Sequence, residues 1–312
     1  MMSLLGAVLM MMATPAQAGV ASRLFIDSHA SSVMKAGQAT DWVIEIYNPD
    51  SSEPIHHFHL MHEKEVHLIV VSEDLASFAH IHPMRTGMHK GLFEIRVNEA
   101  STDPDNFDAL QAVQLSGRYY LFSEAMPMGM SMVTLPLDLK AEGAERVLQP
   151  LVVNELDSGG SVIQDIGDYR VTFRPEYYLH CHTYAMKLNT KIERKSGASS
   201  TNYAPVTDLE PWLASYGHAI LVSEQGDTAR TKKMLHLHAV WPLLDDPDSP
   251  HGPDVELAVE NHNGPMVSGV YKIWLQFKHQ GKVLTVPVVL NVQLPKSKGQ
   301  KRCYAPFLNS GT

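Results

Sequence analysis

The stretch VHLIVVSEDLASFAHIHP, residues 66–83, indicates both the fold and the chemistry of this chain. It opens with one histidine ahead of an apolar run, turns through polar residues, and returns with a His-x-His pair. A second stretch, GHAILVSEQGDTARTKKMLHLHAVWP at residues 217–242, repeats this pattern. The matched stretches predict two copies of one β-rich domain. Their six histidines are His67, His80 and His82, then His218, His236 and His238.

Each stretch can be drawn as an antiparallel hairpin that gathers its three imidazoles. In the first hairpin His67 then faces His82, and His80 lies on the same face because side chains alternate along a strand. Directly opposed Cβ atoms lie roughly 5 Å apart. Three histidines are a recurrent ligand set for zinc or copper. If the two strands of a stretch lie in opposite sheets, the argument for convergence weakens. The alternative to a metal site is packing histidines at a domain rim, hydrogen-bonded to backbone.

Alternation of polar and apolar residues dominates the rest of the chain, which is typical of half-buried strands. The halves also share a Ser-Gly-x-Tyr motif, at 116–119 and 268–271, followed by a Thr-x-Pro strand. Pro136 and Pro287 within such strands indicate sheet edges. Strands are predicted at 41–47, 92–97, 118–122, 133–139, 169–173, 187–193, 271–277 and 283–292, with a turn or two of helix at 106–113.

This pattern predicts an all-β protein of two tandem β-sandwich domains, of immunoglobulin or cupredoxin-like type. The length of 312 residues suits two domains. We place domain 1 at 20–142 and domain 2 at 165–295, joined by a linker at 143–164. A basic tail follows at 296–312.

The N-terminus has the pattern of a secretory signal peptide, residues 1–18. An apolar run precedes the A-x-A site Ala16-Gln17-Ala18, although no basic residue precedes the run. The alternative is a buried N-terminal helix. No segment is long enough to span a bilayer, and a net charge of -9 disfavours a nucleic-acid partner. We expect a secreted, periplasmic protein.

A second unusual feature is four alternating methionines at the tip of the last hairpin of domain 1. Thioether sulfur is a soft ligand that selects Cu(I) over Zn²⁺. The alternative is a methionine stripe that fills an irregular apolar gap. The residues are Met126, Met128, Met130 and Met132.

Two further groups carry possible ligands. The segment 54–63 contains four histidines that are possible ligands, His56, His57, His59 and His62. The alternative is that this segment is a solvated loop. The run His180-Cys181-His182 can capture a metal ion by itself, or Cys181 can pair with Cys303 in a disulfide. The sequence favours neither.

The run from His62 to Pro83 resembles a family of secreted bacterial two-domain β-sandwich proteins that are associated with copper and heavy-metal handling. Their pattern is close to HEKxxHLIVVSxDLxxFxHxHP, and a second domain carries DLEPxLxxYGH followed by LHxHP. Here the second pattern begins at Asp208 and ends at His238, but Ala239 replaces the final Pro and residues near 229–233 look inserted. The resemblance therefore implies a second site that is weaker than the first.

Together these features predict a periplasmic protein that binds copper, with zinc possible, for metal resistance or delivery. Its partner would be another periplasmic or membrane metal-handling protein. The alternative is an exported interaction module whose histidines are structural. An enzyme with a mononuclear copper or zinc centre ranks last, because nothing else in the sequence supplies a convincing general acid or base.

Overall fold

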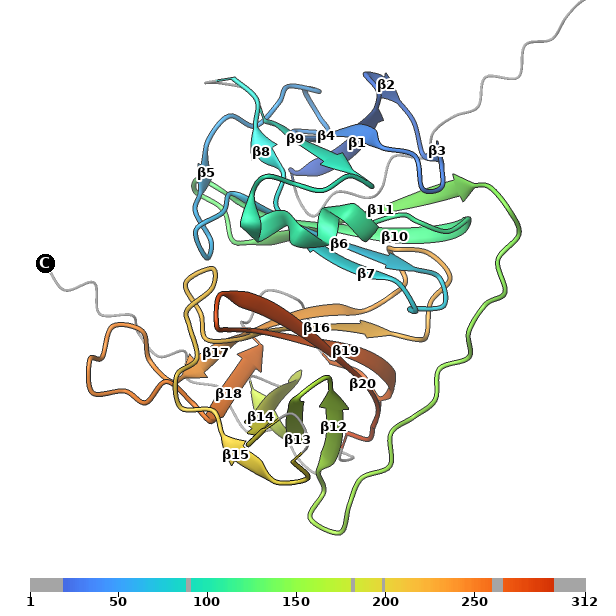
Figure 1. The fold of residues 1–312 in the computed structure, drawn as a ribbon. Helices are drawn as coiled ribbons and strands as arrows, with labels where there is room; N and C mark the ends of the chain where they lie inside the picture. The colour runs from blue at the N-terminus through green and yellow to red at the C-terminus, as the bar shows by residue number, and fades with distance from the viewer. Residues whose placement is uncertain (1–18, 88–90, 181–182, 198–199, 260–265, 295–312) are drawn as a thin grey trace, which may run out of the picture.

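The computed structural model describes residues 19–87, 91–180, 183–197, 200–259 and 266–294. It is an all-β protein whose two halves are stacked one on the other, with the linker running along one side of both (Figure 1). The predicted all-β sandwich class is confirmed. The described residues include no helix long and apolar enough to cross a membrane.

Domain 1 contains two sheets that enclose one apolar core. The first has the order β2-β1-β4-β9-β8, and the second has the order β3-β11-β10-β6-β7 with β5 paired to β10. A short 3-10 helix, η1 (Pro104–Gln111), lies where a helical turn was predicted. The strands are β1 (Ala21–Ile26), β2 (His29–Ala30), β3 (Val33–Lys35), β4 (Thr40–Tyr47), β5 (Phe58–His59), β6 (Val66–Ser72), β7 (Phe78–Ile81), β8 (Met84–Arg85), β9 (Leu92–Val97), β10 (Gly117–Pro127) and β11 (Val133–Glu142).

Domain 2 curls one nine-stranded sheet around its own core. The order is β12-β13-β14-β18-β17-β16-β19-β20, with β15 paired to β14. The strands are β12 (Val162–Ile166), β13 (Tyr169–His180), β14 (Thr183–Lys195), β15 (Tyr203–Pro205), β16 (His218–Ser223), β17 (Met234–Trp241), β18 (Asp254–Val259), β19 (Gly269–His279) and β20 (Lys282–Val292).

A single proline accounts for a difference between the two domains. Pro83 has no amide hydrogen for a strand ladder, and it separates β7 from β8, which pairs with β9 in the other sheet. Ala239 occupies the equivalent position in domain 2. There β17 continues past Ala239, with a register shift between Ala239 and Trp241, and pairs with both β16 and β18, so one sheet takes the place of two.

The shared Ser-Gly-x-Tyr motif forms a tyrosine corner in each domain. The hydroxyl of Tyr119 donates to the carbonyl of Leu115 at 2.9 Å, and that of Tyr271 donates to Val267 at 3.0 Å. Both bonds reach back four residues and fix the start of a long core strand, as in other β-sandwiches.

The central strands β6 and β16 are buried on both faces. Their alternate residues point into the sandwich core of their own domain, while the others, such as Ile69 and Ile220, form a third apolar cluster between the domains. Phe78 stacks on Trp274 there with ring centroids 4.6 Å apart. The cluster comprises Ile69, Val71, Leu75, Phe78, Tyr120, Phe122, Ile220, Val222, Ala229, Met234 and Trp274.

One connection fixes the linker, and another reinforces the interface. The linker is tied to domain 1 by an ion pair between Arg146 and the buried Asp74, whose other oxygen accepts from the amide of Gln149. The segment that looked inserted, near 229–233, reaches across to domain 1. The amide of Ala229 donates to Asp138, and the ammonium of Lys232 lies over the ring of Tyr120.

The strands predicted from alternation are all present, and β10, β13, β14 and β19 extend beyond the predicted bounds. Pro287 lies in an edge strand as predicted, and Pro136 lies where β11 has only β10 as a neighbour. The predicted signal peptide, Cys181, His182 and Cys303 lie outside the described residues, so the choice between a disulfide and a His-Cys-His site stays open.

Trp274 tests the interface. We expect Trp274→Ala to lower the free energy of unfolding by about 3–5 kcal/mol, because it removes a buried ring that stacks across both domains. Tyr178→Ala, at a residue that is 40% exposed, is the matched control and should change it little. Chemical denaturation measures both, and equal small losses would contradict a stabilising interface.

Candidate metal centre

The predicted hairpin register is confirmed in both domains. His218 pairs directly with His238 in the β16–β17 ladder. In domain 1, Leu68 pairs with Ile81 and Ile69 with His80, which places His82 across from His67. The six histidines lie on the faces of the hairpins that meet between the domains. Each stretch brings its three histidine ligand atoms within 4.8 Å of one another.

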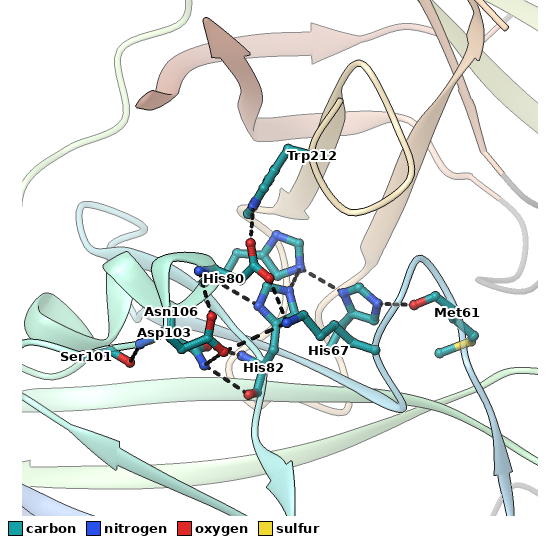
Figure 2. A network of polar contacts seen from close by, with 10 residues as sticks. Met61, His67, His80, His82, Ser101, Asp103, Asn106 and Trp212 are labelled. Atoms are coloured by element: carbon teal, nitrogen blue, oxygen red, sulfur yellow. Dashed lines mark hydrogen bonds and ion pairs between the residues drawn. The ribbon is translucent and has the colours of Figure 1, made fainter. Parts of the chain in front are cut away.

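In the first triad, formed by His67, His80 and His82, three ring nitrogens converge (Figure 2). The Nε2 of His80 lies 3.1 Å from Nδ1 of His67 and 3.2 Å from Nε2 of His82. The other nitrogen of each ring faces an oxygen acceptor. These acceptors are the carbonyl of Met61 at 2.8 Å, the side-chain oxygen of Gln276 at 2.9 Å and the carbonyl of Asp105 at 3.1 Å.

The outward oxygen acceptors favour one tautomer for each ring. A neutral imidazole has one N–H, and each ring donates it outward to an acceptor, so three lone pairs face one another at the centre. Lone pairs held this close repel, and a cation placed among them removes the repulsion. Outward bonding of metal-binding histidines to carbonyls is the usual pattern in protein metal sites.

The second triad is formed by His218, His236 and His238. The Nε2 of His218 donates to the carbonyl of Trp212 at 3.0 Å, and the Nδ1 of His236 lies 2.7 Å from a carboxylate oxygen of Glu124. The ring of His238 stacks on His62 of domain 1, with centroids 3.6 Å apart. This triad therefore has a carboxylate in contact with one ligand, where the first triad has an amide.

Matching turns position the first histidine of each triad. Met61 and Lys64 exchange backbone hydrogen bonds around His62 and Glu63, and both of these central residues have positive φ, at 45° and 68°. Trp212 and Ser215 close the same turn around Leu213 and Ala214, at 49° and 48°. Non-glycine residues are strained in this region. The strained turn aims a carbonyl at the ring of the histidine that follows.

The two triads form one continuous cluster. The rings of His80 and His236 lie 5.1 Å apart across the domain boundary. Each bonds to a residue of the opposite domain, His80 to Gln276 and His236 to Glu124. Glu124 is the strand partner of His67, and Gln276 is the strand partner of His218. The contacts are therefore reciprocal, as in a two-fold dimer.

Burial controls the electrostatics of the cluster. The loss of water lowers the pKa of His67, and it lowers the pKa values of His80, His82 and His218 well below the usual range. Repulsion between neighbouring imidazoles adds to the shift for the last three. These rings are thus neutral near pH 7, the protonation state in which histidine binds metals.

The η1 segment seals the outer edge of the first triad. The backbone amide of His82 donates to Asn106 at 2.6 Å, and that of His80 donates to Asp108 at 3.2 Å. These side chains replace the missing neighbour of the edge strand β7. Burial raises the pKa of Asp108 to about 6. Lys64 fixes the same segment through its ion pair with Asp105 at 2.7 Å.

A cavity of about 230 Å³ opens beside the second triad. Of the four predicted methionines, Met126 and Met132 line it, whereas Met128 and Met130 are exposed at the hairpin tip. The methionine segment is thus divided between the cavity and the surface. The lining residues are Leu60, Met61, His62, His67, Glu124, Met126, Met132, His236 and His238.

Of the four histidines in the segment 54–63, only His62 joins the cluster; His56, His57 and His59 are exposed. The sequence also missed Glu124 and Gln276. Both occupy the same place in the repeat, five residues after the corner tyrosine, and alternation puts each on the interface face of a strand. Aligning the corner motifs would have paired them.

A family comparison explains the repeat. The sequence model of a family described as a domain of unknown function (DUF8832) matches residues 24–143 and again residues 164–294. The chain belongs to this family. Its halves are two DUF8832 domains, and a search of curated proteins gives no match. Because the family description names no metal, the predicted association with copper stays a prediction.

Because these imidazoles are buried, we expect the stability of the metal-free protein to depend on pH. Histidine in the unfolded chain takes up a proton near pH 6.5, whereas the four rings with lowered pKa stay neutral in the folded state. The free energy of unfolding should therefore be highest above pH 6.5 and decrease below it. The decrease should be at most about 3 kcal/mol between about pH 7.5 and 6. Asp108 acts in the opposite direction, mainly below about pH 6.

Urea denaturation of metal-free protein across this range measures the effect. His80→Asn/His82→Asn should flatten the dependence, because it removes two of the four groups. A flat profile for the unaltered protein would contradict neutral buried rings.

Proposed function

We propose that this protein binds copper in the two histidine triads between its domains. The observation that carries the proposal is the first triad. Each of its rings donates outward to an oxygen, and its three remaining nitrogens converge. A structural histidine needs only hydrogen-bond partners. Three lone pairs aimed at one point form a ligand set that suits a cation.

The methionines favour copper over zinc. Met61, Met126 and Met132 line the cavity next to His236 and His238. Thioethers bind Cu(I) and are poor ligands for Zn²⁺, while imidazole accepts either oxidation state of copper as well as zinc. A cavity that combines thioethers and imidazoles thus suits copper best, and zinc is the competitor to be tested.

The cellular role follows from location. The signal-like pattern of residues 1–18 supports a periplasmic location as part of this proposal. There a buried copper centre would serve metal resistance or delivery, with another periplasmic or membrane metal-handling protein as donor or acceptor. The rival function is an exported interaction module with structural histidines.

A competition titration of the mature chain with Cu(I), Cu(II) and Zn²⁺ tests the proposal. We expect up to two Cu(I) ions per chain, bound more tightly than Zn²⁺ by at least about tenfold. In the His80→Ala/His82→Ala variant, one of the two ions should be lost. His56→Ala/His57→Ala, which alters exposed histidines, is the matched control and should leave binding unchanged.

No binding tighter than roughly 10⁻⁵ M for any of the three ions would eliminate the metal proposal. The rival module would then stand, and the histidine variants would lower stability alone. Tighter binding of Zn²⁺ than of either copper ion would retain the centre and overturn the choice of metal.

A further inference from the structure

One of the differences between the two triads is the residue whose carbonyl accepts from the first histidine. Met61 and Trp212 are equivalent, because each lies six residues before the first histidine of its triad and gives that ring its carbonyl acceptor. Their side chains differ in size and in what they do to the space around the centre.

Trp212 fills the space on its side. It is only 4% exposed, and its indole packs against three histidines, with ring centroids 5.2 Å from His218, 5.7 Å from His80 and 6.2 Å from His82. Its Nε1 donates to Asp105 at 3.0 Å, which anchors the ring over the first triad (Figure 2).

The side of Met61 is open instead. The cavity lies there, and it reaches His236 and His238 of the second triad and His67 of the first. The buried carboxylate of Glu124 lines it as well, where Gln276 occupies the equivalent place on the closed side. The open side therefore offers negative charge and thioethers, while the closed side offers a neutral amide and an indole.

We propose that metal exchanges with solvent through the opening of this cavity and that, within the described residues, Trp212 closes the equivalent route on the other side. This inference rests on the proposed copper function. The exchanging ion is then Cu(I), because the thioethers that line the cavity select it. The second triad then loads and unloads first. The first triad exchanges more slowly, through the cavity wall that includes His67.

A reciprocal swap of the two equivalent residues tests the proposal. Met61→Trp introduces an indole into the open side, and Trp212→Met removes it from the closed side. Both variants keep the backbone carbonyl that His67 or His218 needs. The measurement is the rate at which an excess of a coloured Cu(I) chelator removes Cu(I) from the fully loaded full-length protein, without oxygen.

We expect two phases of about equal amplitude in the unaltered protein. Met61→Trp should slow the fast phase by roughly tenfold or more, a change that corresponds to about 1.4 kcal/mol in the barrier. Trp212→Met should speed the slow phase toward the fast one. Met84→Leu, at an exposed thioether outside the cavity, is the control and should change neither rate by more than a factor of about two.

The outcomes separate this proposal from the function it rests on. No Cu(I) bound at equilibrium overturns both. Normal stoichiometry with a single phase, or with rates that the swap leaves unchanged, overturns the proposed exchange route and leaves copper binding intact. If Met61→Trp fails to fold, Met132→Phe, which fills the same cavity from β11's side, should slow the fast phase instead.

Discussion

Burial of β6 and β16 on both faces is the constraint on which the rest of this structure depends. One face of each strand belongs to its own sandwich, and the other belongs to the partner domain. The six histidines lie at the ends of these strands or on their hairpin partners and are at most 4% exposed, so their N–H groups need acceptors within the protein. The strained turns, the η1 segment and the opposite domain supply those acceptors. In the first triad, the N–H of each ring donates outward to an oxygen, so the lone pair on the other ring nitrogen points inward.

The two domains use one plan with different side chains. Glu124 corresponds to Gln276, and Met61 to Trp212. A carboxylate bonded to an imidazole increases the basicity of the ring and offsets part of the charge of a bound cation. A neutral amide in the same place only orients the ring. Duplication thus explains why there are two triads, and divergence at these few positions makes them chemically unequal. The expectation that the second triad is the weaker one rested on Ala239 and on the longer connection. The structure assigns these features to sheet continuity and domain docking.

Local periodicity in the sequence was enough to predict most of the longer strands, although not β1, β12 or β18, together with the hairpin register and the grouping of histidines into two triads. It could not place the triads beside each other, since that depends on how two rigid sandwiches dock. The continuous apolar runs after His67 and His218 held part of this information, because strands buried on both faces lose their alternation. Contacts such as His80 with Gln276 join residues far apart in the chain and leave no periodic trace. The methionine segment shows the same limit, since only the docked structure separates Met126 and Met132 from the exposed tip.

Docking and metal binding are coupled in this arrangement. His80 takes its acceptor from domain 2, and His236 takes its acceptor from domain 1. Separated domains would leave both rings free to turn, so a cation binds the docked state better than the undocked one. A ligand that prefers one state stabilises that state, and linkage makes the effect mutual. Without a cation, the repulsion between converging lone pairs and the strain of the two positive-φ turns destabilise the docked state, and the apolar cluster between the domains offsets this cost. The apolar interface around Phe78 and Trp274 therefore stabilises the docked state, and a bound ion would add to that stability by removing the repulsion between the histidines.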